Sequence, residues 1–251
     1  INSDSKRVTD LTAFTRSAMH ELLDIDDVID VIDTHNITTL VSTGNGRGRI
    51  GATAALAAHE TFTDFTYECI SYRDETNWGT ERDVNTESVA NAHTEHHPKI
   101  WDNYDPVTDD VVCVPHTPCP VLHGVRGDDI ESVVDAANMI TGESVIGRQV
   151  YVTNQGTDAH ITAINPAELQ DDTSYSVTGT VVDAPETVEG GHVFFTVTQE
   201  TGGVVTCAAF EPTKRFRDDI RCLREGDTIT MFGEYSDETL KLEKFSVNEL
   251  D

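Results

Sequence analysis

The alternation of apolar and polar positions is clearest in the last third of the chain. Five runs there follow the period of two that is typical of half-buried β-strands, and glycine pairs such as Gly190-Gly191 and Gly202-Gly203 mark turns between them. A short helix is expected at 214–223, between the third and the fourth run. Five strands with a helix after the third is the order of an OB-fold β-barrel. We therefore predict an OB-fold over 167–251, with strands at 175–182, 192–197, 204–209, 228–234 and 239–247.

Before residue 167 the apolar positions follow two different periods. Residues 1–36 carry apolar side chains at helical spacing and are predicted to be a helical linker from a missing upstream domain, since the chain begins at Ile1 rather than Met. Residues 37–166 are predicted to form a ferredoxin-like domain with the order β-α-β-β-α-β, so the fold class is α+β. The expected strands are 37–41, 65–72, 111–115 and 149–153, the expected helices are 50–60 and 129–140, and a polar excursion fills 73–108.

A glycine-rich stretch at 44–58, GNGRGRIGATAALAA, joins the first expected strand to the first expected helix of this domain. Gly46, Gly48 and Gly51 match the GxGxxG spacing of dinucleotide-binding loops, where backbone N–H groups bind phosphate. Alternatively, the glycines only make a tight turn and let the helix pack closely. A dinucleotide-dependent enzyme is disfavoured, because the expected strands are too few for a doubly wound sheet. Phosphate binding by this loop stays open at this point.

The chain is strongly acidic, with 45 acidic and 17 basic residues and a net charge of −28. The acids are spread along the whole chain, which indicates adaptation to molar salt, where the screening length is about 3 Å. A mesophilic protein with a basic partner is the alternative, although its acids would more often gather in one patch. An odd number of cysteines, five, indicates reduced thiols and a cytoplasmic protein. No stretch has the length of a membrane span, so no membrane partner is expected.

Two other groups of side chains are candidates for chemical sites. Cys113, His116, Cys119 and His123 could be imagined around zinc, but three prolines and an unusual spacing fit a tetrahedral site poorly, so no metal ligands are predicted. The segment 210–217 is basic in an otherwise acidic chain. It is either a helix balancing its own acids or a contact for a nucleic-acid backbone beside stacking aromatics.

Seven motifs occur along the chain in one order and spacing: GNGRGRIGATAA, FTYECISYR, NWGTER, VPHTPCPVLHGVRG, VTNQGTDAH, VEGGHVFF and AAFEPTKRFR. Together they resemble the archaeal tRNA 2-agmatinylcytidine synthetase (agmatidine synthetase) family over nearly the whole chain. That family uses ATP to join agmatine to the wobble cytidine of an isoleucine tRNA. The resemblance, with the acidic composition, implies a protein of a halophilic archaeon.

The resemblance also implies a domain plan. The family has a kinase-like domain with a GIDDTDS motif for ATP and metal, a ferredoxin-like domain, an OB-fold and a zinc ribbon. This sequence lacks GIDDTDS and a four-cysteine ribbon, so it resembles the central part only. The resemblance therefore implies an agmatine-binding domain at 37–166 and a tRNA-binding OB-fold at 167–251. ATP and Mg²⁺ would serve the full-length enzyme at catalytic residues that are unknown here, and this fragment would bind neither and be inactive alone.

Within this resemblance, specific residues are expected to hold the ligands. Agmatine carries a guanidinium, which suits a carboxylate and an aromatic face, and an amine, which must lose a proton before it attacks. We expect Glu68 or Asp158 to take the guanidinium, Tyr72 or Trp78 to cover it, and Thr80 and Asn154 to fix the chain. The rival interpretation pairs Glu68 with Arg73 or Arg82 as a plain sheet-face carboxylate. The expected tRNA contacts are Arg47, Arg49, Phe194, Lys214, Arg215 and Arg217.

One alternative function of a different class stays open at the sequence level. A non-catalytic OB-fold protein that binds nucleic acid, with a ferredoxin-like appendage, would show the same barrel and the same basic segment. A GIDDTDS motif upstream of Ile1 would distinguish the ligase from this alternative.

Overall fold

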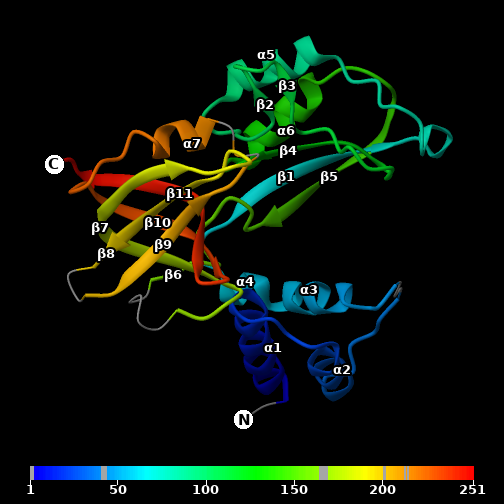
Figure 1. Cartoon of the computed structure of the whole chain (residues 1–251). Helices are drawn as coiled ribbons and strands as arrows, with labels where there is room; N and C mark the ends of the chain where they lie inside the picture. The colour runs from blue at the N-terminus through cyan, green and yellow to red at the C-terminus, as the bar shows by residue number, and fades with distance from the viewer. Residues whose placement is uncertain (1–2, 41–43, 164–168, 200–201, 212, 214) are drawn as a thin grey trace. The chain divides into compact units, whose positions relative to one another are not determined.

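The computed structural model describes residues 3–40, 44–163, 169–199, 202–211, 213 and 215–251. Contacts divide the chain into two compact units (Figure 1). Unit 1 joins Ile1–Thr61 to Asp158–Asp251, and unit 2 is Phe62–Thr157. The domain boundaries predicted from the sequence, at 36/37 and 166/167, differ from the boundaries of these units and stay a prediction. No helix among the described residues has both the length and the apolar character needed to cross a bilayer.

Unit 1 contains a closed barrel of five strands. Strand β7 pairs with both β8 and β10, and the remaining pairs are β8–β9, β9–β11 and β11–β10 (Figure 1). Only the β9–β11 pair is parallel within this ring. This confirms the predicted OB-fold order, with helix α7 between the third and the fourth strand. The bounds are β7 Thr173–Thr187, β8 Val193–Thr198, β9 Val204–Ala209, α7 Arg215–Ile220, β10 Thr228–Ser236 and β11 Thr239–Glu249, and a short strand β6, Thr162–Ala163, runs parallel to β7.

The barrel core follows directly from the alternation in the sequence. In β8 every second side chain is buried, namely those of Val193, Phe195 and Val197. They pack against Ile229 and Met231 of β10, which are fully buried. Burying each such side chain contributes about 1.5–3 kcal/mol to stability relative to leaving it exposed.

The N-terminal part of unit 1 is helical. Its elements are α1 Ser3–His20, α2 Ile25–Thr34, α3 Gly48–Ala54, the 3₁₀ turn η1 Ala55–Ala57 and α4 Ala58–Thr61. The buried Thr15 hydroxyl donates to the carbonyl of Ala54 at 2.8 Å, which ties α1 to the end of α3. The helical prediction for 50–60 is therefore confirmed.

Unit 2 is a three-stranded antiparallel sheet with β1 in the middle, between β4 and β5. Its bounds are β1 Thr66–Arg73, η2 Glu75–Asn77, α5 Thr86–His96, β2 Tyr104–Asp105, β3 Asp110–Val111, β4 Val121–Gly127, α6 Ile130–Met139 and β5 Val145–Thr153. Helices α5 and α6 cover one face of the sheet, where Cys69 and Val125 pack against Val89 and Val133 (Figure 1). The strands predicted at 65–72 and 149–153 and the helix at 129–140 are confirmed.

Two predicted strands are wrong. Residues 37–40 form no strand, and the side chain of Leu40 is 90% exposed; β-branched residues need a partner strand to be held extended. Of the strand predicted at 111–115, only Val111 is in a strand, and that strand, β3, pairs with β2 alone. The strand beside β1 is β4, which the prediction missed because it contains Gly124, Gly127 and the charged Arg126. Helix α5 was also missed within the polar excursion.

Candidate functional site

The face of the unit 2 sheet opposite α5 and α6 carries the first predicted site residue, Glu68. Successive side chains of a strand point to opposite faces. Because Cys69 faces α5 and α6, Glu68 and Tyr72 lie on the opposite face, as predicted from their spacing. The Cα partners of Glu68 are Arg126 in β4 and Tyr151 in β5. A carboxylate, a guanidinium and a phenol therefore meet across the three strands.

Glu68 is held by its neighbours on β4. Its side chain is 15% exposed, and Oε1 accepts a hydrogen bond from Nε of Arg126 at 3.2 Å. Arg126 also lies 3.8 Å from the carboxylate of Asp102. A Cβ atom added at Gly124 would lie 2.6 Å from Glu68 Oε1, so the carboxylate rests on this glycine. The rival pairing of Glu68 with Arg73 or Arg82 is wrong, because its partner is Arg126.

Two tyrosines stand beside this carboxylate. The hydroxyls of Tyr72 and Tyr151 share a hydrogen bond of 2.7 Å. This bond, with burial and the nearby charge of Glu68, raises the pKa of Tyr72 to about 12. Tyr151 is 44% exposed and lies directly opposite Glu68 in the strand pair. No role was predicted for Tyr151 from the sequence, although it lies in a predicted strand; only the register shows that it faces Glu68.

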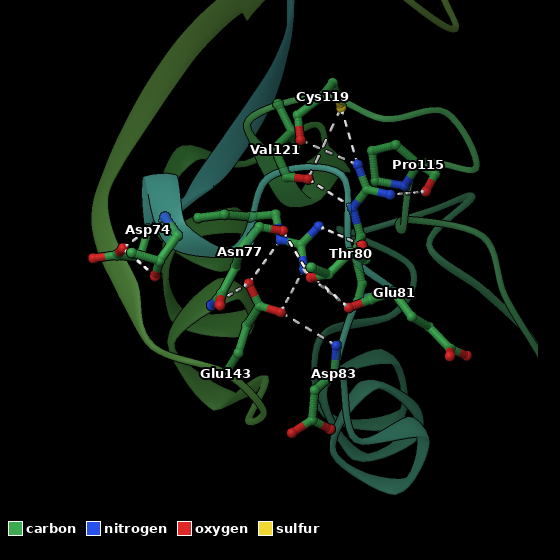
Figure 2. Close-up of polar contacts among 12 residues, drawn as sticks. Asp74, Asn77, Thr80, Glu81, Asp83, Pro115, Cys119, Val121 and Glu143 are labelled. Atoms are coloured by element: carbon green, nitrogen blue, oxygen red, sulfur yellow. Dashed lines mark hydrogen bonds and ion pairs between the residues drawn. The ribbon is translucent and has the colours of Figure 1, made fainter.

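Trp78 and Thr80 lie on the segment that follows β1. Trp78 ends the 3₁₀ turn η2 and is 48% exposed. Thr80 is engaged already, since its carbonyl and hydroxyl oxygens accept hydrogen bonds from the Arg73 guanidinium at 2.9 and 3.2 Å. Glu143 binds the same guanidinium, and Figure 2 shows its carboxylate between Asn77 and Asp83. Hydrogen bonding from Arg73 lowers the pKa of Glu143.

Asn154 and Asp158 belong to different units. Asn154 follows β5 in unit 2, and its carbonyl accepts hydrogen bonds from the backbone N–H and the hydroxyl of Thr157. Asp158 belongs to unit 1, where its carboxylate pairs with Nζ of Lys244. The pocket predicted to combine Asp158 with the β1 residues therefore stays a prediction.

The basic residues predicted to contact tRNA differ in how they are held. Arg215 is exposed at the start of α7, and no hydrogen bond or ion pair to a described residue is found for its side chain. Arg217 donates to Glu211 Oε1 at 2.9 Å and to the Gly191 carbonyl, so both terminal nitrogens of its guanidinium are engaged, whereas its buried Nε has no partner among the described residues. Lys214 lies outside the described residues.

Phe194 has acidic surroundings. Its ring packs edge-to-face on Phe210, with centroids 5.9 Å apart. It also lines a cavity of about 500 Å³ together with three carboxylates, those of Asp183, Glu186 and Glu225. Carboxylates repel phosphates, so this environment suits an RNA backbone poorly.

Arg47 and Arg49 belong to the glycine-rich stretch. Arg47 donates to the Leu23 carbonyl at 3.1 Å, and Arg49 donates to the Gly46 carbonyl at 3.3 Å. Helix α3 starts at Gly48, and the described residues before this stretch, 37–40, form no strand. The strand–glycine–helix arrangement of a dinucleotide site is therefore not formed by them.

The described residues contain no cluster of metal-ligating side chains. Among them, no three His, Cys, Asp or Glu side chains come together as a group that could hold a metal ion. His123 is fully buried in β4, and neither of its ring nitrogens has a hydrogen-bond partner among the described residues. His123 therefore belongs to no group of potential metal ligands among the described residues.

Comparison with known proteins gives one consistent result. The family model described as the TiaS FLD domain matches residues 46–160. The isoleucine-tRNA 2-agmatinylcytidine synthetase TiaS of Methanosarcina mazei is 44% identical over 245 residues, which cover 96% of this chain and 56% of that protein. The protein of the same description from the halophile Haloquadratum walsbyi is 39% identical over 269 residues, which cover 92% and 57%. The chain thus spans little more than half the length of these curated relatives.

Solved structures agree over almost the whole chain. The crystal structure of the ZRD-deleted mutant of TiaS in complex with agmatine has a TM-score of 0.89 and 40% identity, and it covers 98% of this chain and 68% of that one. The complex of TiaS with its isoleucine tRNA, AMPCPP and agmatine has a TM-score of 0.87 at 40% identity, with 98% and 61% covered. The sequence motifs, the OB-fold barrel and these similarities lead to one conclusion: the chain belongs to the tRNA 2-agmatinylcytidine synthetase TiaS family.

Proposed function

We propose that this chain is the agmatine-binding and tRNA-binding part of an ATP-dependent ligase that attaches agmatine to the wobble cytidine of an isoleucine tRNA. The observation that carries the proposal is the likeness, over 98% of the chain, to a TiaS structure in complex with agmatine. ATP and Mg²⁺ would act in the complete cytoplasmic enzyme, with a kinase-like domain and a zinc ribbon as further parts of the same protein. We assign no residue of this chain to ATP or Mg²⁺.

The agmatine site that we propose is the sheet face around Glu68, opposite α5 and α6. The Arg126 guanidinium already bonds one oxygen of this carboxylate, which supports a fit for a planar cation there. Glu68 Oε2 would receive the ligand's guanidinium, and the rings of Tyr72 and Tyr151 would face it through cation–π contact. Trp78 and Asn154 would meet the remainder of the molecule. Asp158 is a weaker candidate, because it belongs to unit 1 and not to this sheet.

Agmatine affinity should depend on Glu68. Isothermal titration calorimetry of the chain in molar KCl should show binding, and Glu68→Gln should weaken it by about tenfold or more, since a hydrogen bond to a charged group contributes about 1.5–3 kcal/mol. Trp78→Ala should weaken it too. Unchanged affinity in Glu68→Gln, Trp78→Ala and Asp158→Asn together would remove this pocket from consideration.

A pair of glycine variants sharpens this test without touching a ligand-binding side chain. Gly124→Ala places a methyl group 2.6 Å from Glu68 Oε1, closer than van der Waals contact, and should therefore displace the carboxylate and weaken agmatine binding. Gly51 is the control, because it lies in α3 of unit 1 and an added Cβ would meet nothing within 4 Å. Gly51→Ala should bind agmatine like the wild type. Equal affinities of the two variants would contradict the position that we propose for the ligand.

Binding of tRNA should depend on Arg215 more than on Arg217. At molar salt, counterion release contributes little, so direct hydrogen bonds and stacking must carry the affinity. In filter binding at molar KCl, Arg215→Ala should weaken isoleucine tRNA binding by about threefold, the effect of one lost hydrogen bond. Arg7→Ala, on the exposed surface of α1, is the control and should change nothing. If wild type and Arg215→Ala bind equally, α7 does not contact the tRNA.

A further inference from the structure

Two arginines organise the whole segment 74–83 that follows β1. Arg73 is 1% exposed and forms a two-point ion pair with Glu143, with N–O distances of 2.7 and 2.8 Å. Its other N–H groups donate to the carbonyls of Thr80 and Glu81 and to the Thr80 hydroxyl. A single buried guanidinium therefore determines the course of the backbone at two successive residues.

Glu143 binds the same segment from the other side. Besides Arg73, it accepts hydrogen bonds from the Asn77 side chain at 3.4 Å and from the Asp83 backbone N–H at 3.3 Å (Figure 2). A Cβ atom at Gly142 would lie 2.0 Å from the Asp83 carbonyl oxygen, so the segment packs directly on the backbone before Glu143. Residues on both sides of Trp78 are thus fastened to one carboxylate.

Arg82 fastens the segment to a second loop, at 115–121. Its guanidinium donates to the carbonyls of Val121 and Pro115 at 2.8 and 2.7 Å (Figure 2). It also donates to the carbonyl of Thr117 at 2.9 Å. At the start of the segment, the Asp74 carboxylate accepts from the N–H and the hydroxyl of Thr76, which holds the turn η2. The hydrogen bonds lower the pKa of Asp74.

A gain in stability does not by itself explain the buried ion pair of Arg73 and Glu143. Burying an ion pair costs several kcal/mol per ion in desolvation, and apolar side chains of similar volume often stabilise as well or better. The product of the network is a segment of fixed shape that presents one exposed tryptophan between its fastened residues. A fixed aromatic surface binds a ligand with less loss of conformational entropy than a mobile one.

We propose that Arg73, Glu143 and Asp74 are positioning residues for Trp78 in agmatine binding. They touch no ligand themselves, and they act by holding the backbone that carries Trp78 where this residue meets the bound agmatine. The inference rests on the proposed function, because it needs agmatine within reach of Trp78. It adds an aromatic side chain, carried on a backbone that a buried ion pair fixes, to the proposed site.

The test uses Trp78 as its own reporter. The chain has two tryptophans, Trp78 and Trp101, so a Trp101→Phe background leaves one emitter. Agmatine titrations followed by Trp78 fluorescence and by calorimetry would be compared among this background, Asp74→Ala and Glu143→Gln. Asp129→Ala is the control: Asp129 caps α6 by accepting from the N–H and hydroxyl of Ser132, elsewhere in unit 2, and it also forms an exposed ion pair with Lys99.

Asp74→Ala and Glu143→Gln should each weaken agmatine binding by about tenfold, the effect of ordering one aromatic side chain on binding. They should also make Trp78 more accessible to acrylamide quenching in the absence of agmatine. Asp74 is at the surface, so we expect Asp74→Ala to fold. Asp74→Ala therefore still tests the proposal if Glu143→Gln fails to fold. Asp129→Ala should keep both the affinity and the quenching of its background.

Different outcomes separate the two proposals. If the background chain binds agmatine and Asp74→Ala and Glu143→Gln bind it equally well, the positioning role is wrong and the proposed function stands. If Asp129→Ala loses as much agmatine affinity as Asp74→Ala and Glu143→Gln, the loss reflects a general destabilisation of unit 2. This outcome would also contradict the positioning role. No agmatine binding by the wild-type chain would overturn the proposed site itself, and this inference with it.

Discussion

Glu143→Leu should lower the free energy of unfolding by about 3–5 kcal/mol, because it leaves the Arg73 guanidinium buried without its counter-charge. Arg73 is 1% exposed, and Glu143 has little more contact with solvent. Guanidinium-chloride unfolding in molar salt, followed by tryptophan fluorescence, would measure the change. Because both tryptophans belong to unit 2, the signal reports on the unit that contains the ion pair.

Two further variants distinguish the buried pair from ordinary surface pairs. The double variant Arg73→Met with Glu143→Leu should recover part of the lost stability, since no unpaired charge remains buried. Lys99→Met breaks an exposed pair with Asp129, of 3.4 Å, and should change the stability by less than about 1 kcal/mol. A loss in Glu143→Leu as small as that in Lys99→Met would show that water reaches Arg73 and that the pair is not a buried clamp.

Acidification should destabilise unit 2 through His123. Burial and the nearby Arg148 charge lower the pKa of His123 to about 4, against about 6.5 in an unfolded chain. Above pH 6.5 the ring is neutral in both states and has no effect. Between pH 6.5 and 4 the unfolded chain takes up a proton that the folded chain does not. The free energy of unfolding therefore decreases as the pH is lowered, by about 3 kcal/mol in total.

Replacing His123 isolates this contribution. His123→Leu should remove that part of the pH dependence, measured as the unfolding free energy between pH 7.5 and 4.5. The exposed His116 is the control, and His116→Leu should keep the wild-type slope. A slope that is the same in wild type and His123→Leu would mean that His123 is protonated in the folded protein over this range.

The barrel and the sheet of unit 2 differ in how far the sequence alone determines them. Each barrel strand carries its own alternation and ends at a glycine or polar turn, so the order β-β-β-α-β-β could be predicted. Strand β4 carries no such signal. An added Cβ at Gly127 would lie 2.4 Å from the Lys99 carbonyl oxygen, so this glycine is required by a segment far along the chain. Residues 37–40 show the converse, a β-branched run that finds no partner strand.

The candidate site divides in the same way. The period of two alone determined that Glu68 and Tyr72 share a face, because alternation is a property of one strand. Only the tertiary structure decided that this face also holds Arg126 and Tyr151, because the register between strands depends on which distant segments bury each other's apolar sides. Likewise, Asp158 pairs with Lys244 in the barrel unit, and Arg73 pairs with Glu143 rather than with Glu68. Local stereochemistry sets the pattern within a segment, whereas the choice of charged partners follows from how separate segments pack.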